Sequence, residues 1–134
     1  MDIQDGQDIG LKHAGITESV IGCAFEVANE LGAGFLESVY EKALLSALRH
    51  KGLSAIAQHP IKVTFRGECV GDFCADIFVE GKVIVELKAA KAIAPEHQAQ
   101  IINYLNATGL EVGLLINFGN PKLEYKRFTR NRRE

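Results

Sequence analysis

The chain has 134 residues, of which 47% are hydrophobic and 24% charged, and its formal net charge is −2. This length suits a single domain, residues 1–134, with a core of its own, and the composition is that of an ordinary soluble globular protein. No apolar run approaches the roughly 18 residues of a membrane span, and no signal peptide is visible, so neither a membrane protein nor a secreted one is indicated.

Cysteine usage indicates a reducing compartment. Cys23, Cys69 and Cys74 are odd in number and form no Cys-x-x-Cys motif, which argues against a disulfide framework and against a zinc knuckle. We interpret them as small buried residues. We therefore expect a cytoplasmic protein, in which the acidic and polar residues 1–15 form a flexible amino-terminal end.

The first half of the chain predicts two helices and a strand. Apolar residues at helical spacing predict a helix over 18–31, with Thr17 as its N-cap, and a second helix over 36–51. A strand is predicted over 55–65. Pro60 within it indicates a sheet edge or a bulge, because proline has no amide hydrogen to donate to a neighbouring strand.

The second half adds a β-hairpin over 73–88, a helix over 95–108, a buried strand over 111–118 and a short last strand over 126–130. The connection through the 95–108 helix is long enough to join two parallel strands by a crossover. The predicted fold class is therefore α/β (α+β), with a mixed β-sheet flanked by α-helices.

The hairpin over 73–88 places charges on otherwise apolar strands. A two-residue loop would put Asp76 and Glu86 on opposite faces, whereas a three-residue loop over 79–81 pairs Asp76 with Ile84 and separates apolar from polar side chains completely. We prefer this register, since a slip of one residue moves every side chain to the other face, and it predicts a positive φ at Gly81. The expected apolar face consists of Phe73, Ala75, Ile77, Val83, Val85 and Leu87. The expected polar face consists of Asp72, Cys74, Asp76, Ile84, Glu86 and Lys88.

Two carboxylates and an ammonium group would thus lie side by side. A pair of carboxylates resists double ionisation unless a cation lies near both, and oxygen ligands suit Mg²⁺ or Mn²⁺. Asp76 and Glu86 are therefore candidate metal ligands, with Lys88 beside them. The alternative is a cluster of surface ion pairs on a half-exposed strand.

Positive charge gathers at the carboxyl-terminal end. Residues 119–134 contain six basic residues and two acidic ones, and the segment 126–134 is its most basic part. Lys126, Arg127 and Arg130 could contact the phosphates of a nucleic acid, or they could only keep the end soluble. The same alternatives hold for Lys91, which follows the hairpin.

The order of these elements, with Asp followed by Glu-x-Lys on the hairpin, resembles the PD-(D/E)xK nuclease superfamily. The segment GFLESVY, residues 34–40, is similar to the signature of its small GxxExxY family, and LLINFGNPKL, residues 114–123, resembles the closing segment of that family. The likeness extends over residues 16–130. One departure is that Ala75, rather than proline, precedes Asp76.

The resemblance implies roles for individual residues. Asp76 and Glu86 match the metal-binding carboxylates, and Lys88 matches the lysine that orients the attacking water and stabilises the charge that develops. Glu37 matches an acidic residue that is a further metal ligand. Its simpler role would be to favour the positive end of a helix.

Gln100 and the tyrosine four residues later, Tyr104, resemble a Gln-x-x-x-Tyr motif of exonuclease-like branches. Both would lie on one face of the predicted helix. They could reach substrate or position a ligand, or they could form only a half-buried polar contact. Gly34 is expected to have a positive φ before the second helix.

The resemblance implies a nuclease that uses Mg²⁺ or Mn²⁺ to hydrolyse phosphodiester bonds, and it favours DNA over RNA as the partner. One alternative is a catalytically silent module of the same fold that binds nucleic acid or protein. Another is a structural or regulatory protein in which the charges only stabilise the sheet. The sequence leaves open endonuclease against exonuclease action and the oligomeric state, with a homodimer among the alternatives.

Overall fold

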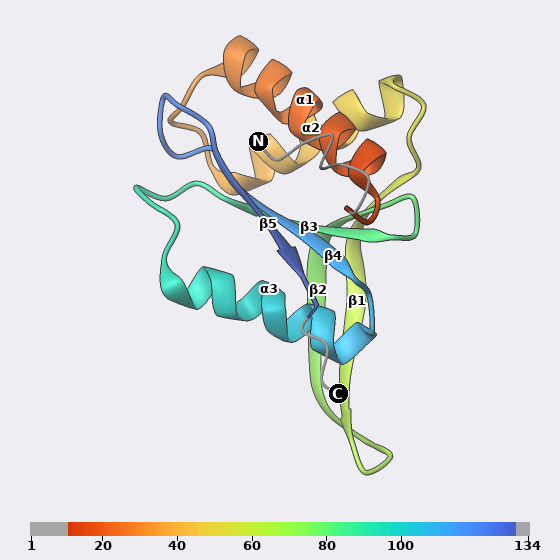
Figure 1. The fold of residues 1–134 in the computed structure, drawn as a ribbon. Helices are drawn as coiled ribbons and strands as arrows, with labels where there is room; N and C mark the ends of the chain where they lie inside the picture. The colour runs from red at the N-terminus through yellow and green to blue at the C-terminus, as the bar shows by residue number, and fades with distance from the viewer. Residues whose placement is uncertain (1–10, 131–134) are drawn as a thin grey trace.

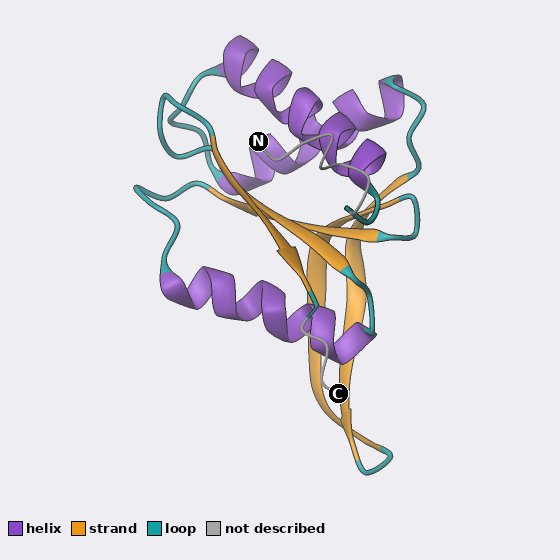
Figure 2. Ribbon diagram, viewed as in Figure 1, coloured by secondary structure: helices purple, strands orange, loops and turns teal. Residues whose placement is uncertain are grey.

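The computed structural model describes residues 11–130 and shows a five-stranded mixed sheet between two layers of helix (Figures 1 and 2). The elements in chain order are α1 (Ala14–Leu31), α2 (Glu37–His50), β1 (Ala55–Phe65), β2 (Glu68–Val79), β3 (Val83–Lys88), α3 (Pro95–Thr108), β4 (Val112–Asn117) and β5 (Glu124–Thr129). The predicted fold class is confirmed. Residues 1–10 of the predicted flexible amino-terminal end and residues 131–134 of the basic carboxyl-terminal end lie outside the described residues.

The strands follow the order β1-β2-β3-β4-β5 across the sheet. Only β3 and β4 pair in parallel, and α3 connects them, as the length of that connection predicted. β1 with its Pro60 lies at the edge of the sheet, where a strand tolerates a missing donor. The predicted last strand exists as β5, over Glu124–Thr129.

Helix α1 begins earlier than its sequence predicted. It starts at Ala14, so Thr17 lies inside the helix, where its hydroxyl donates to the Ala14 carbonyl at 3.1 Å. His13, with a φ of 56°, occupies the N-cap position. The prediction failed because a threonine that bonds a preceding carbonyl within a helix has the same sequence signature as a capping threonine. Residues 14 and 15 therefore belong to α1 and not to the amino-terminal end.

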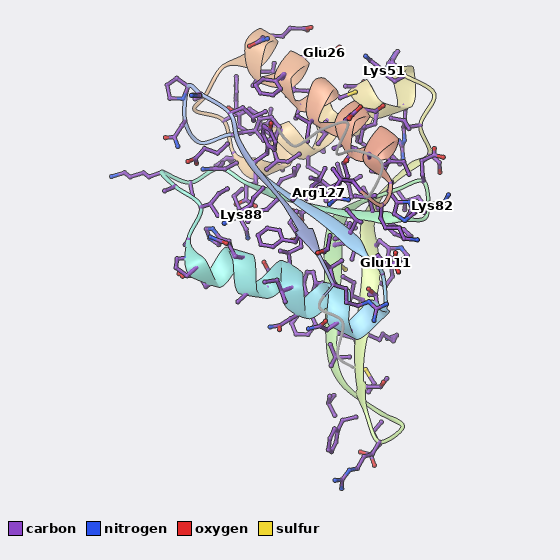
Figure 3. All side chains as sticks on the ribbon, in the orientation of Figure 1. Glu26, Lys51, Lys82, Lys88, Glu111 and Arg127 are labelled. Carbon is purple, nitrogen blue, oxygen red and sulfur yellow. The ribbon has the colours of Figure 1, made fainter. Side chains whose placement is uncertain are left out.

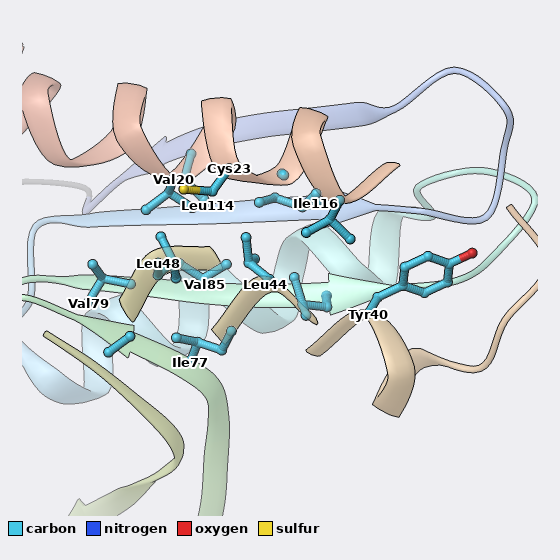
Figure 4. Packing of buried hydrophobic residues seen from close by; sticks show 14 of the residues in the cluster. Val20, Cys23, Tyr40, Leu44, Leu48, Ile77, Val79, Val85, Leu114 and Ile116 are labelled. Atoms are coloured by element: carbon cyan, nitrogen blue, oxygen red, sulfur yellow. The ribbon is translucent and has the colours of Figure 1, made fainter. Parts of the chain in front are cut away.

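Helices α1 and α2 cover one face of the sheet, and α3 covers the other (Figure 1). The larger buried cluster lies under α1 and α2, and Figure 4 shows part of it, including Val20, Leu44, Ile77, Val85 and Leu114. The smaller cluster lies under α3 and consists of Ile61, Ala75, Ile84, Tyr104 and Leu105. Burial of both sheet faces explains why β4 is apolar along most of its length.

The β2–β3 hairpin has a different register from the predicted one. Val79 pairs with Val83, and Ile77 pairs with Val85. Glu80 and Gly81 both have a positive φ, of 56° and 65°, and the Lys82 amide donates to the Val79 carbonyl at 3.0 Å. This is a type I′ turn followed by an extra residue, Lys82. The predicted positive φ of Gly81 is confirmed.

The predicted apolar face is correct for β3 and wrong for the first half of β2. Ile77 belongs to the cluster under α1 and α2, but Ala75 belongs to the cluster under α3, and Phe73 is 48% exposed. Asp76 lies between Ala75 and Ile77, and Gln58, which lies between the two residues of β1 that pair with them, has a φ of 53°. Perfect alternation along one flat strand therefore does not hold across this point.

The three cysteines differ in burial. Cys23 is buried as expected, but Cys69 and Cys74 are exposed, so the prediction of three buried cysteines is wrong. Both exposed residues belong to β2, the end of which extends with β1 beyond the helices as an arm (Figure 2). Within residues 11–130, no helix combines the length and hydrophobicity needed to span a membrane.

Candidate active site

Asp76 and Glu86 lie side by side where the strands β2 and β3 separate. Regular pairing of the two strands ends at Ile77 and Val85. Just beyond, the Asp76 amide donates to Glu86 Oε2 at 2.9 Å, and the Leu87 amide donates to Asp76 Oδ2 at 2.7 Å. Each carboxylate thus accepts a main-chain hydrogen bond from the opposite strand, and together these bonds fix the positions of both side chains.

Burial gives this pair unusual electrostatics. Glu86 is only 4% exposed, and burial, followed by the negative charge of Asp76, raises its pKa to about 8. Burial also raises the pKa of Asp76, and the charges of Glu41 and Glu37 add to that effect. The hydrogen bond that each carboxylate accepts and the charge of Lys88 act in the opposite direction. Without a further cation, the pair therefore resists full ionisation at neutral pH.

The residues present fit a divalent cation. Among the described residues no hydrogen-bond donor contacts Asp76 Oδ1 or Glu86 Oε1, and neither oxygen is a fully buried atom without a partner. Within residues 11–130 no three His, Cys, Asp or Glu side chains are arranged around one point that could hold an ion. Mg²⁺ is commonly bound by one or two carboxylates, with water and phosphate oxygens completing its coordination shell.

Helix α2 brings two more carboxylates toward this pair. Glu37 is its first residue and is exposed, and its charge raises the pKa of both Asp76 and Glu86. Glu41 is half-buried, accepts a hydrogen bond from Gln58 at 3.0 Å, and affects the pKa of Asp76 more strongly than Glu37 does. Our sequence reasoning did not identify Glu41. Its spacing of four residues from Glu37, which places both on one face of a helix, was the available signal.

The remaining residues of the GxxExxY segment shape the turn before α2. The Tyr40 hydroxyl donates to the Gly32 carbonyl at 2.5 Å and accepts from the Phe35 amide at 3.2 Å. Its ring is buried and stacks on Phe118 at 4.6 Å. Gly34 has a φ of 115°, which confirms the predicted positive value. Tyr40 thus holds the turn that presents Glu37.

Gln100 and Tyr104 share one face of α3, as their spacing predicted. Gln100 Nε2 donates to the Tyr104 hydroxyl at 3.0 Å. Burial, followed by the charge of Glu86, raises the pKa of Tyr104, so the hydroxyl lies within electrostatic reach of the carboxylate pair. Ile84, two residues before Glu86 on β3, packs in the cluster that contains Tyr104, which explains this proximity.

Lys88 is the last residue of β3 (labelled in Figure 3) and is half-buried. Within residues 11–130 it forms no direct ion pair with Asp76 or Glu86, although its charge lowers the pKa of both. Its carbonyl accepts from the Phe118 amide at 2.8 Å, which anchors the main chain at this point. The ammonium group therefore stays available for a further anionic partner.

The segment after Lys88 is held by Asn117, which our sequence reasoning missed. This buried amide lies beside Lys88 on β4, accepts from the Ala90 amide and donates to the Ala90 carbonyl, both at 2.9 Å. A side-chain carbon at Gly119 would lie 2.0 Å from the Ala90 carbonyl oxygen, so glycine is required there. A lone amide at the end of an apolar strand was the signal that could have revealed Asn117.

The predicted phosphate-binding residues differ in burial and in their partners. Lys126 is exposed and donates to Gln98 of α3 at 3.1 Å, whereas Arg127 is half-buried and donates to the Lys12 carbonyl just before α1. Among the described residues, Arg130 Nε and Arg127 Nε are buried without a partner. Lys91 is exposed, and its carbonyl accepts from Asn120. Since residues 126–129 belong to β5, they also contribute to the sheet.

The raised pKa of Glu86 predicts a pH-dependent stability in the absence of metal. A carboxyl that holds its proton more tightly when folded stabilises the fold below its unfolded pKa, here 4.5, and loses that contribution as the pH rises through about 8. We expect the free energy of unfolding in EDTA to fall across this window, by up to about 1.4 kcal/mol per pH unit. Urea unfolding measured from about pH 4 to about pH 8.5, a range that brackets this window, provides the check.

Glu86→Gln should flatten that pH profile and make the metal-free protein more stable near its upper end, because a neutral amide carries no ionisation cost. The matched control is Glu68→Gln, since Glu68 is an exposed residue at the start of β2. If Glu86→Gln retained the slope of the unchanged protein, the buried carboxyl would not be its source.

Comparison with known protein families matches residues 14–128 to the PD-(D/E)XK nuclease superfamily. Because the match extends over most of the chain, the protein belongs to this superfamily. The five-stranded mixed sheet, with helices on both of its faces, is consistent with the fold of that superfamily.

Two solved structures share the fold at low sequence identity. The crystal structure of SSO0001 has a TM-score of 0.54 at 17% identity, over 87% of this chain and 59% of that one. An alkaline exonuclease from Laribacter hongkongensis (LHK-Exo) has a TM-score of 0.51 at 13% identity, over 92% of this chain and 74% of that one. This chain thus spans less than two thirds of SSO0001. Comparison with curated proteins gives no match.

Proposed function

We propose that this protein is a Mg²⁺- or Mn²⁺-dependent nuclease of the GxxExxY branch, which hydrolyses phosphodiester bonds in nucleic acid, with DNA favoured over RNA. The observation that carries the proposal is the Asp76–Glu86 pair: two carboxylates side by side, each fixed by one main-chain amide, each with a second oxygen that has no hydrogen-bond donor among the described residues. Membership of the nuclease superfamily and a fold shared with an alkaline exonuclease support it.

In this proposal Asp76 and Glu86 hold the metal ion. Glu37 joins them as a further ligand when the ion binds, since the described residues do not already group it with the pair around one point. A divalent cation in such a site supplies a water of lowered pKa and neutralises phosphate charge. Lys88 contributes a positive charge where the oxyanion of the reacting phosphate develops. Gln100 and Tyr104 position the substrate or a ligand from α3. Lys91 and Lys126, both exposed, contact phosphates farther along the strand.

Arg127 and Arg130 are weaker candidates for phosphate contacts than Lys91 and Lys126. Both are half-buried, and Arg127 already donates to the main chain before α1. Deleting residues 126–134 would not test their role, because the deletion also removes most of β5. Single substitutions of Lys91 and Lys126, with the salt dependence of binding as the readout, separate phosphate contact from solubility.

The second candidate is a catalytically silent module that uses the same fold to bind nucleic acid or protein. The presence of Asp76, Glu86 and Lys88 together favours the enzyme, since a silent module has no need of all three. Metal-dependent cleavage would identify an enzyme, and metal-independent retention of nucleic acid would identify the module. The absence of both would leave a structural or regulatory protein.

Metal binding has a direct test in thermal unfolding. Titration with Mg²⁺ or Mn²⁺ should raise the melting temperature, because a ligand specific for the folded state stabilises it by mass action. The rise should be larger at about pH 8 than at about pH 6, because the carboxylate pair carries fewer protons at the higher pH and then attracts a cation more strongly. Asp76→Asn should abolish the response, and Glu37→Gln should weaken it.

The matched control for this titration is Asp72→Asn. Asp72 lies four positions before Asp76 on β2, is exposed, and forms an ion pair with Lys62 at 2.8 Å. Its variant should respond to metal as the unchanged protein does. Equal metal-induced shifts in the Asp76→Asn and Asp72→Asn variants would contradict a metal site at the carboxylate pair.

A further inference from the structure

A groove of about 600 Å³ lies between α3 and the arm formed by β1 and β2. We call it the α3 groove, and the residues that line it include Phe73, Glu96, Gln100, Asn103, Tyr104 and Asn106. Its volume falls within the roughly 300–1,000 Å³ that is typical of sites for small molecules. Its residues come from β1, from β2 and from one face of α3, and of these β2 and α3 also contribute to the candidate active site.

The wall of the α3 groove combines an aromatic face with side-chain amides. Phe73 is 48% exposed, and its ring lies 5.8 Å from that of Tyr104 at an angle of 44°. Gln100, Asn103 and Asn106 add carboxamides, each of which can both donate and accept hydrogen bonds. A flat ligand with polar edges matches such a wall.

The charge of the α3 groove disfavours a phosphate as its ligand. Among the described residues that line it, Glu96 is the only charged one, and its negative charge repels an anion. A nucleobase carries no charge, offers a face that stacks on aromatic rings, and has hydrogen-bonding edges that carboxamides recognise. The α3 groove therefore fits the base of a nucleotide better than its phosphate.

The α3 groove lies near the carboxylate pair, although neither Asp76 nor Glu86 lines it. Gln100 lines the groove and donates to the Tyr104 hydroxyl, which lies within the electrostatic reach of Glu86. On β2, Phe73 precedes Asp76 by three residues, about 10 Å along the strand. A base in the groove would thus belong to a nucleotide close to the phosphate at Asp76 and Glu86.

We propose that the α3 groove binds an unpaired nucleobase of the strand that is cut, stacked on Phe73, so that the substrate is single-stranded nucleic acid or an unpaired end. The inference rests on the proposed nuclease function and adds the substrate class. A base within a duplex is stacked on its neighbours, and exposing its face requires unstacking and unpairing. Substrates with unpaired bases avoid that cost.

A tryptophan at position 73 provides the test, because the sequence contains none. Phe73→Trp should show quenched fluorescence when a short single-stranded oligonucleotide is added in EDTA, which prevents metal-dependent cleavage. An abasic oligonucleotide of the same length, with the same phosphates, should leave the signal unchanged, and a duplex should change it less. The matched control is Phe65→Trp near the arm tip, where the side chain is 59% exposed and outside the groove.

The fluorescence anisotropy of a labelled oligonucleotide measures its total binding to the protein. Phe73→Ala should weaken binding of the single-stranded oligonucleotide by about 5- to 150-fold, the range found when a stacking aromatic is removed. Asn103→Ala, at an exposed helical position that alanine suits, should weaken it in the same direction. Binding of the abasic oligonucleotide should be unaffected by either change.

The outcomes separate the two proposals. Two results would overturn the base site and leave the nuclease proposal intact. One is binding of the labelled oligonucleotide with no fluorescence change in Phe73→Trp. The other is an equal fluorescence change with base-bearing and abasic oligonucleotides. If no oligonucleotide binds and none is cleaved with metal, the nuclease proposal fails, and the base site fails with it.

Discussion

Lys88→Ala is expected to slow cleavage of nucleic acid by about 10²–10³-fold, the usual loss when one group that stabilises an oxyanion is removed. The ammonium group makes no direct ion pair with Asp76 or Glu86, among the described residues, yet its charge lowers the pKa of both. It is therefore close to the site and not neutralised by it. A residue in that position can act on charge that develops in the transition state.

Binding should change far less than rate in this variant. One phosphate contact among several is a modest part of the affinity, so the dissociation constant for the oligonucleotide should stay close to that of the unchanged protein. Cleavage rate and binding need to be measured on one preparation with metal saturating. A variant that cuts at the original rate would remove Lys88 from the chemistry.

Lys82→Ala is the matched control for Lys88→Ala. Lys82 precedes the other end of β3, about 20 Å away along the strand, and is exposed on the hairpin turn. The same loss of charge there should leave the cleavage rate unchanged. A similar loss of rate in both variants would indicate a general effect of net charge on substrate attraction.

The fold was predictable from the sequence because its elements carry strong local signals. The helix 95–108 and the strand 55–65 match α3 and β1 at both ends, and the buried strand 111–118 contains β4. Two-residue periodicity correctly placed Glu86 and Lys88 on one side of β3. Element order and the length of the α3 connection then indicated the parallel β3–β4 pair.

Details that depend on turn geometry were not predictable in the same way. The register of the β2–β3 hairpin follows from a type I′ turn at Glu80 and Gly81 with Lys82 as an extra residue, and glutamate is not a typical residue for a positive φ. The observed register differs from the predicted one by two residues, so the side chains near the turn keep their predicted faces. The break in alternation between Ala75 and Ile77 has no counterpart in the spacing of apolar residues.

The missed residues depend on contacts between distant segments. Asn117 hydrogen-bonds Ala90, and Gly119 packs against the same residue, so both roles appear only when the ends of β3 and β4 are adjacent. Glu41 approaches Asp76 only because α2 packs over the sheet. The surroundings of the basic end also depend on such contacts, since Lys126 donates to Gln98 of α3 and Arg127 donates to the main chain before α1.

Metal-dependent cleavage by the Asp76–Glu86 pair is the central claim, and one assay tests it most directly. The unchanged protein, Asp76→Asn and the control Asp72→Asn are incubated with single- and double-stranded DNA and RNA, with Mg²⁺ or Mn²⁺ and with EDTA. We predict cleavage by the unchanged protein and by Asp72→Asn with metal, none in EDTA, and only background cleavage by Asp76→Asn. Cleavage that persists in EDTA or in Asp76→Asn, or no cleavage of any polymer with metal, would contradict the claim.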